Sequence, residues 1–235
     1  MAGARTVRVG MLAPMRPELA PLVRRLEMSD AGSHHRGTTT DGVEVVAMLT
    51  NIGMANAASA AKRIIELRVD HVMVVGIAGG VDESRLSIGD VIVPEVVVRR
   101  SDKREFRPTF VGEIVPGGTL SCGDDLITDP AVLSVMAAAG VIAVDMETAA
   151  VARVCDAAGV PWSVFRGISD FAGEGLVDAA LLALTKLDGT ADQPALAKYL
   201  EVNPDRREVL VRLAKDTNRA THAAATAAIA ACAAL

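Results

Sequence analysis

The chain has 235 residues, of which 51% are apolar, so it can build a packed core and long disordered segments are excluded. A net charge of −5 and only 3% aromatic residues argue against nucleic acid as a partner, because the chain lacks both an excess of cations and a supply of stacking rings. The three cysteines form no CxxC pair, which predicts reduced thiols and no metal site, and we expect no cofactor.

The N-terminal apolar stretch is too short for a signal-peptide core or a membrane span, because Pro14 and Arg16 follow it. We therefore expect a cytoplasmic protein without membrane insertion. Along the chain, short valine-rich runs alternate with helical patterns, which is typical of a sheet with helices on both faces. The expected strands are residues 6–12, 43–49, 71–76, 90–98, 141–146 and 161–167. The expected helices are residues 17–28, 55–67, 130–139, 148–158 and 205–234, the last with Asp205 as a candidate cap.

Residues 99–116 contain five basic side chains and show no regular pattern. We expect an extended loop or hairpin there, and we favour a solvated charged loop over a flap or a subunit contact. We find no internal repeat and no linker long enough to separate two domains. Residues 1–235 are therefore predicted to form a single domain.

In an open α/β sheet, ligands bind beyond the carboxyl ends of the strands, so polar residues directly after strands are the first candidates. The glycine-rich run at residues 76–80 follows the third strand and would let the backbone approach a ligand closely. It carries no phosphate-binding motif, and a structural turn explains it equally well.

Three carboxylates occupy similar junctions, and each has two interpretations. Glu147 either serves a helix N-terminus or accepts two hydrogen bonds from a vicinal diol such as that of ribose. Asp170 lies among glycines and is either a turn residue or an acid whose pKa is raised in a cleft walled by Ile168 and Phe171. Glu18 is a third candidate, with helix-dipole complementarity as its alternative.

Five segments in order carry a family resemblance: VRVGMLAPMRPEL, NIGMANAASA, VVGIAGGVDESRLSIGDVIV, AVDMETAAVARVC and VFRGISD. Together they resemble the nucleoside phosphorylase superfamily, and within it the methylthioadenosine/S-adenosylhomocysteine nucleosidases. The resemblance implies a three-layer α/β fold around a central mixed, partly barrel-like sheet flanked by helices. It also implies a homodimer or larger homo-oligomer that cleaves the N-glycosidic bond of a small-molecule purine nucleoside.

The resemblance assigns roles to individual positions. Asp170 matches the acid that protonates the leaving base at N7, and Glu147 matches the carboxylate that holds the ribose hydroxyls. Glu18 matches the residue that activates the attacking water, and Arg166 matches an arginine that helps to position this water. The implied substrate contacts are Met15 and Ile52 on the 5′ side of the sugar, Met146 beside the ribose, Leu126 and Ile127 bordering the base, and Ile77, Gly79, Ser169 and Phe171. Leu126 stands where the family commonly has Phe, so weaker stacking on the base is expected.

The nucleophile separates hydrolases from phosphorylases within this superfamily. A phosphorylase must bind a phosphate dianion with cations or a dense set of donors. Val74 and Ile77 stand where bacterial hexameric phosphorylases have Arg and Ser, whereas Glu18 is available as a base for water. Hydrolysis is therefore the preferred interpretation and phosphorolysis the alternative.

Two departures leave the substrate open. Ile77 replaces a Ser that is usual in the nucleosidases, and the helical segment from about residue 176 diverges from the short helix of that family. A 5′-modified adenosine is the leading substrate, with futalosine-type or adenosyl-lipid nucleosides as alternatives. A nucleoside-binding protein without turnover is a further hypothesis, but retention of Glu18, Glu147, Arg166 and Asp170 argues against it.

Overall fold

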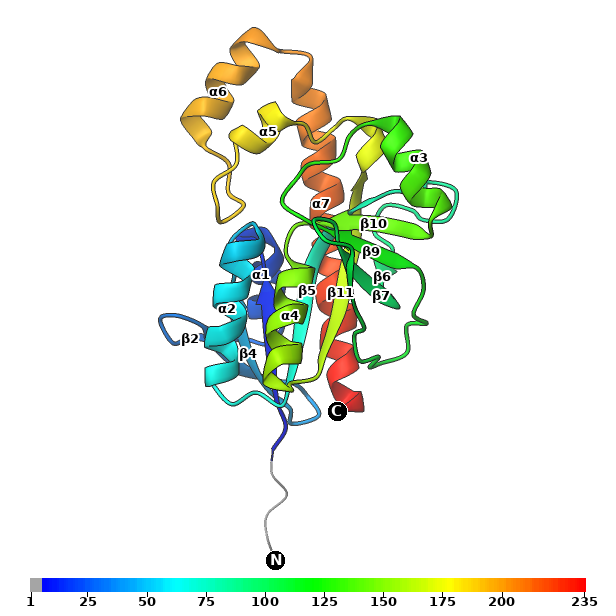
Figure 1. Cartoon of the computed structure of the whole chain (residues 1–235). Coiled ribbons are helices and arrows are strands. Elements are labelled where there is room, and N and C mark those ends of the chain that lie inside the picture. Colours follow the sequence, from blue (N-terminus) through cyan, green and yellow to red (C-terminus); the bar gives the residue numbers. More distant parts are fainter. Residues whose placement is uncertain (1–5) are drawn as a thin grey trace, which may run out of the picture.

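The computed structural model describes residues 6–235, which form a mixed sheet flanked by helices (Figure 1). The parallel strands β4 (Glu44–Leu49), β1 (Arg8–Ala13), β5 (His71–Gly80) and β11 (Trp162–Phe171) make up its centre, and β10 (Val141–Asp145) joins β5 in the antiparallel direction. The main path of the sheet runs through β2 (Ser29–Asp30), β3 (His35–Thr38), β4 (Glu44–Leu49), β1 (Arg8–Ala13), β5 (His71–Gly80), β10 (Val141–Asp145), β9 (Thr119–Cys122), β7 (Val96–Arg99) and β8 (Arg104–Phe106). Off this path, β11 (Trp162–Phe171) pairs with β5 and β6 (Val91–Ile92). The predicted α/β class with a mixed sheet is confirmed.

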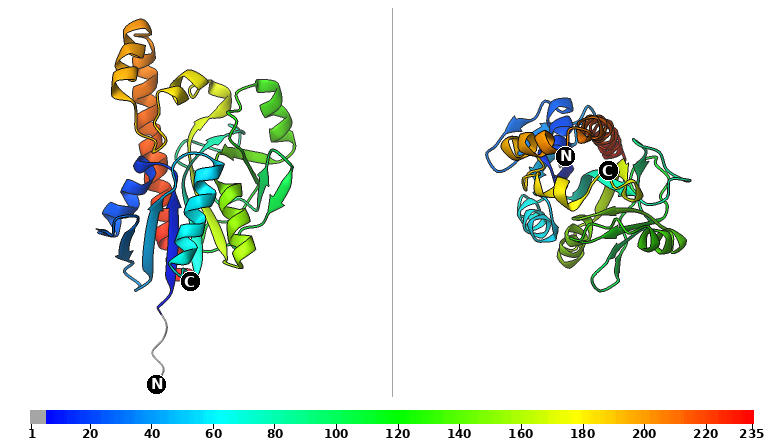
Figure 2. Two further views of the ribbon diagram at one scale, coloured as in Figure 1. Left: turned by 60° about the vertical axis from the view of Figure 1, so that its left-hand side comes forward. Right: turned by 90° about the horizontal axis from the view of Figure 1, so that it is seen from above.

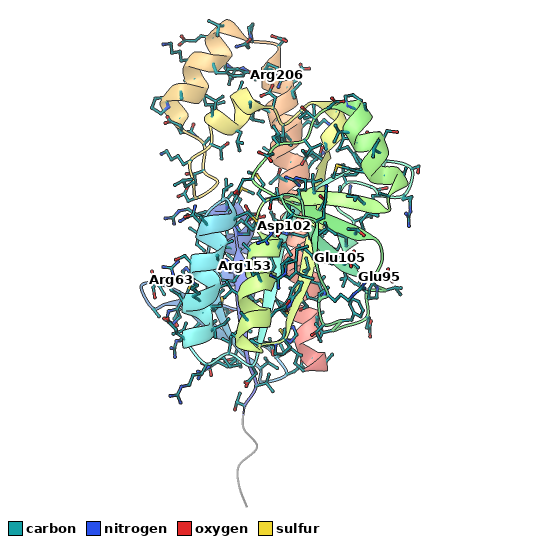
Figure 3. The ribbon with its side chains drawn as sticks, in the orientation of Figure 1. Arg63, Glu95, Asp102, Glu105, Arg153 and Arg206 are labelled. Carbon is teal, nitrogen blue, oxygen red and sulfur yellow. The ribbon has the colours of Figure 1, made fainter. Side chains whose placement is uncertain are left out.

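Helices cover both faces of the sheet and give the core two parts. Helices α2 (Met54–Glu66) and α4 (Thr148–Ala158) pack together on one face, with Ile64 and Val151 fully buried. Helices α1 (Arg16–Arg25) and α7 (Arg206–Ala231) cover the other face, as Figure 2 shows. Arg63 of α2 and Arg153 of α4 are labelled in Figure 3, and both are exposed on the outer side of their helices.

Helix α7 lies unusually close to the sheet because of small residues. A side chain on Gly167 of β11 would place its Cβ 2.3 Å from the carbonyl oxygen of Ala220, so only glycine fits there. Ala224, Ala228 and Ala231 of α7 are also buried in this layer. The alanine-rich C-terminus is thus a packed core helix, and among the described residues no helix has the length and apolarity needed to cross a membrane.

The upper part of α7 extends beyond the sheet and joins two helices that the sequence did not delimit (Figure 1). After the 3₁₀ turn η1 (Ala172–Glu174), helices α5 (Ala179–Ala183) and α6 (Gln193–Val202) lead into α7. Asp178 and Asp192 cap α5 and α6 by accepting backbone N–H groups. Asp205 precedes α7, but its side chain makes no capping hydrogen bond, contrary to prediction. Helix α3 (Pro130–Ala138) and the terminal 3₁₀ turn η2 (Cys232–Ala234) complete the set described.

Several strand boundaries differ from the predictions. The expected strand at residues 90–98 is two strands, because Pro94 has no N–H to donate to a neighbouring strand. Before Pro94, β6 pairs with β11, and after it, β7 pairs with β9. The basic stretch after it begins as the hairpin β7–β8, with Lys103 at a φ of 60°. Short strands β2, β3 and β9 were not expected. Strands β5 and β11 continue to Gly80 and Phe171, so the glycine-rich run lies in a strand and not in a turn.

Candidate active site

One cavity of about 490 Å³ opens where β1, β5, β10 and β11 end, at the position predicted for ligands in a sheet of this kind. It brings together most of the residues that the sequence assigned to a site, although they range from Met15 to Asp170 along the chain. The members that line it are Met15, Glu18, Ile52, Ile77, Gly79, Leu126, Ile127, Met146, Glu147, Ser169 and Asp170.

Asp170 reaches the cavity because β11 contains a β-bulge. In the pairing with β5, Ile168 lies opposite Ala78 and Asp170 lies opposite Gly79, so Ser169 is an extra residue. The bulge reverses the alternation of side chains and turns Asp170 away from the core face that Ile168 occupies. Phe171 instead joins Ile168 in the core, with its ring against Gly80. Phe171 and Ile168 are thus not among the described residues that line the cavity, contrary to the expected apolar walls, and the contact of Phe171 with substrate stays a prediction.

The carboxyl group of Asp170 is largely buried, and burial raises its pKa. The Ser169 hydroxyl donates a hydrogen bond of 2.5 Å to Oδ1, which acts in the opposite direction. Gly79 across the strand pair leaves the space in front of Oδ2 open. A buried acid with one oxygen facing a cavity is suited to donate a proton, because it keeps that proton to a higher pH than an exposed aspartic acid does.

Glu18 enters the site from the first turn of α1 and is 1% exposed. Its Oε2 accepts the N–H of Met15 at 2.6 Å, and its Oε1 accepts the N–H of Ile77 at 2.7 Å. The carboxylate thus serves the helix N-terminus and also links α1 to β5. Burial, opposed by Arg166 and reinforced by Glu147, raises the pKa of Glu18 to about 8.

Arg166 is not among the described residues that line the cavity, and its expected part in positioning the attacking water stays a prediction. Its guanidinium is fully buried beneath the carboxylates, where Nη2 lies 2.5 Å from Asp145 Oδ2 and 3.3 Å from Glu147 Oε2. Nη1 lies 3.6 Å from Glu18 Oε1. Burial disfavours the cation, but Asp145, Glu147 and Glu18 outweigh this and raise the pKa of Arg166. One cation therefore holds three carboxylates in place and stays charged.

Asp145 is the member of this cluster that the sequence did not assign to the site. Its carboxylate accepts hydrogen bonds from the N–H and the hydroxyl of Thr148, so it caps helix α4. The sequence does contain a signal for this role of Asp145, because Asp145 lies three residues before Thr148 at the start of an alanine-rich helix, a spacing typical of a helix N-terminus.

Glu147 occupies the N-cap position of α4 but makes no capping hydrogen bond, so its alternative assignment to the helix is not supported. Its Oε1 accepts the N–H of Gly53 at 2.9 Å, and its Oε2 faces Arg166. Burial, opposed by Arg166 and reinforced by Asp145, raises the pKa of Glu147 to about 7. Glu147 lines the cavity, and because each carboxylate oxygen can accept a second hydrogen bond, it can still accept one from a ligand there.

Gly76 is required for this arrangement, and Gly76→Ala tests it. The added Cβ would lie 2.2 Å from Glu18 Oε1 and 2.6 Å from Arg166 Nη1, so both side chains must move. We expect the free energy of unfolding to fall by about 1–3 kcal/mol. Catalytic efficiency is expected to fall by about tenfold to hundredfold, because the carboxylate is displaced.

Thermal unfolding and steady-state kinetics on the purified variant measure both effects. Gly117→Ala is the matched control, since its added Cβ would meet nothing within 4 Å. Equal behaviour of the two variants would mean that the contact between Glu18 and Arg166 is not needed.

The outer half of the cavity was missed by sequence reasoning. It is lined by residues of the segment around α5 and by the upper part of α7, among them Leu181, Leu182, Thr185 and Leu213. None of these belongs to a motif, so the sequence offered no signal beyond a helical pattern. Arg100 and Asp125 also line the cavity, together with the neighbouring Leu126 and Ile127.

Comparison with known proteins identifies a family model described as "Phosphorylase superfamily", which matches residues 8–117 and 112–201. A 5′-methylthioadenosine/S-adenosylhomocysteine nucleosidase of Geobacillus kaustophilus is 29% identical over 205 residues, which cover 72% of this chain and 86% of that relative. The Bacillus subtilis nucleosidase of the same name is 28% identical over 204 residues, covering 72% and 87%.

Solved structures of similar fold span almost the whole chain. The futalosine hydrolase of Helicobacter pylori superimposes with a TM-score of 0.72 at 19% identity, covering 98% of this chain and 99% of that one. The 5′-methylthioadenosine/S-adenosylhomocysteine nucleosidase of Streptococcus pneumoniae gives a TM-score of 0.72 at 20% identity, with 97% and 99% covered. At these identities the likeness establishes the fold.

Proposed function

Because the chain belongs to the phosphorylase superfamily, we propose that it is a purine nucleosidase that hydrolyses the N-glycosidic bond of a 5′-modified nucleoside. The observation that carries the proposal is the convergence of Glu18, Glu147 and Asp170 on one cavity, each with a raised pKa. The names of the nucleosidase relatives support the same reaction class.

The proposed reaction uses the three carboxyl groups in different protonation states. As the bond from C1′ to the base breaks, its electron pair passes to the base, and Asp170 transfers its proton to N7. The sugar becomes oxocarbenium-like, so the negative charge of Glu18 and Glu147 beside it stabilises the transition state. Water then adds at C1′ and gives its proton to Glu18, which leaves free base and pentose.

Glu147 is proposed to bind the ribose diol through a charge-assisted hydrogen bond. Glu147→Gln should weaken this bond by about 1.5–3 kcal/mol and lower catalytic efficiency by roughly tenfold to a hundredfold. A 2′,3′-dideoxy substrate separates this role from a structural one. It should be poor for the parent protein and hardly worse for the variant, whereas equal discrimination by both proteins would exclude contact with the diol.

Hydrolysis is preferred over phosphorolysis because of the charges around the cavity. Among the described lining residues Arg100 is the one cation, and its guanidinium already donates to the carbonyl oxygens of Ser121, Gly123 and Asp125. The side chain of Val74 is buried in the core, and Ile77 contributes its N–H to Glu18. A single arginine already held by three backbone carbonyls is a poor site for a phosphate dianion, which requires several cations or a dense set of donors.

A panel of adenine and hypoxanthine nucleosides, each incubated with and without inorganic phosphate, tests the proposal. We expect base release at a rate independent of phosphate and a free pentose as the sugar product. Chromatography of the base and the sugar measures both. Formation of a pentose 1-phosphate would identify a phosphorylase, and binding without base release over hours would identify a non-catalytic nucleoside-binding protein.

A further inference from the structure

The cavity continues outward from the carboxylates into a second compartment, which we call the outer chamber. Its apolar walls are Val177, Leu181, Leu182, Ala191, Leu213 and Ala214, contributed by the segment around α5 and by α7. The uncharged polar residues Thr185, Thr217, Asn218 and Thr221 of the same segments also line the cavity. These apolar side chains are only partly covered in the folded chain. A half-buried apolar wall continuous with a polar site is typical of a ligand pocket.

A loop of the same chain holds the outer chamber against the inner site. The loop is closed by a β-bridge between Thr185 and Ala191. The carbonyl oxygen of Leu187 accepts the N–H of Ile52 at 2.8 Å, and that of Asp188 accepts the N–H of Arg16 at 2.8 Å. The chamber therefore begins where Met15 and Ile52 line the cavity.

This contact also depends on a glycine at the tip of the loop. Gly189 has a φ of +78°, and a Cβ there would lie 2.3 Å from Cβ of Met15. The loop thus packs directly against Met15 with no space for a side chain.

Two ion pairs of this segment lie outside the chamber. Arg212 of α7 contacts Glu174 at 2.8 Å, and Arg206 contacts Asp178 at 3.1 Å; Figure 3 labels Arg206 at the top of the molecule. None of the described cavity-lining residues between positions 172 and 221 is charged. The chamber consequently offers no cation for a carboxylate and no anion for an ammonium group.

We propose that the outer chamber binds an uncharged, mainly hydrocarbon 5′ substituent and rejects a zwitterionic one such as the homocysteine group. The inference rests on the proposed function, because it takes the ribose to lie at Glu147 with its 5′ carbon toward Met15 and Ile52. Apolar groups gain from leaving water, whereas a buried ammonium or carboxylate without a partner is strongly disfavoured.

A series of 5′-alkylthio-5′-deoxyadenosines from methyl to butyl, together with S-adenosylhomocysteine, tests the proposal. Catalytic efficiency should rise by about fourfold for each methylene, hence by about sixtyfold from methyl to butyl. S-adenosylhomocysteine, which is similar in length to the butyl compound, should be at least about a hundredfold poorer than it. A flat series, or equal efficiency for these two compounds, would overturn the proposal.

Two α7 variants localise the effect. Leu213→Ala removes part of the chamber wall and should reduce the butyl-to-methyl ratio from about sixty to below about ten. Val211→Ala is the matched control, because Val211 is two residues away on α7, is 66% exposed and does not line the cavity. An unchanged ratio in Leu213→Ala would place the alkyl group elsewhere.

Calorimetric dissociation constants for the same series keep this inference separate from the proposed function. If no compound releases adenine but affinity still rises with alkyl length, the proposed binding of alkyl groups in the outer chamber is supported and nucleosidase activity is excluded. If adenine is released from every compound at similar efficiency and affinity, the activity is retained and the chamber's selectivity is excluded.

Discussion

Replacing Asp170 by Asn is expected to lower kcat by about a hundredfold or more, while the affinity for a nucleoside stays within about tenfold. Burial raises the pKa of Asp170, so the side chain holds its proton closer to neutral pH than an ordinary Asp does. Asn has the same size and its amide can donate a hydrogen bond to N7. It has no proton to transfer to the leaving base, so binding and turnover should separate.

Turnover and equilibrium binding measured on one purified preparation of Asp170→Asn decide this prediction. Asp129→Asn controls for the substitution itself, because Asp129 caps helix α3 outside the cavity and Asn preserves a cap. Turnover of Asp170→Asn within about threefold of the parent protein would show that another group supplies the proton.

Replacing Glu18 by Gln should lower catalytic efficiency by about a hundredfold to a thousandfold, the usual scale for losing a general base. Both carboxylate oxygens of Glu18 accept backbone N–H groups, from Met15 and from Ile77. The amide nitrogen of Gln would face one of these donors without forming a hydrogen bond. The variant therefore loses the base and weakens the link between α1 and β5.

The pH profile provides a readout that a purely structural role of Glu18 would not change. A base must be ionised, so activity should increase as pH rises through the raised pKa values of the Glu18 and Glu147 pair, about 8 and about 7. In Glu18→Gln, the residual activity should show a weaker increase over this range. Glu27→Gln, an exposed change just beyond the end of α1, is the control for stability and for pH dependence. A parent-like pH profile in Glu18→Gln would exclude Glu18 as the base.

Much of the site follows from local sequence patterns. The alternation of valine-rich runs with helical segments predicts an α/β sheet, and ligands bind at the carboxyl ends of its parallel strands. Glu18, Glu147 and Asp170 follow or end such strands, so the sequence places them at one edge and the structure finds all three lining one cavity. The family resemblance adds the roles, which stay predictions.

Other features depend on contacts that local patterns do not encode. Phe171 lies in the core because one extra residue in β11 reverses side-chain alternation, and a bulge leaves no mark in hydrophobic periodicity. Arg166 lies behind the carboxylates because Asp145, Glu147 and Glu18 surround it from three different elements.

The outer chamber is the clearest case of a feature that tertiary structure decides. It forms only when the loop at residues 185–191 hydrogen-bonds to Arg16 and Ile52, more than 130 positions away in the chain. The helical pattern of the C-terminal segment predicts its secondary structure, since that depends on neighbouring residues. Its position over the site depends on packing between distant parts of the chain, which sequence spacing alone does not determine.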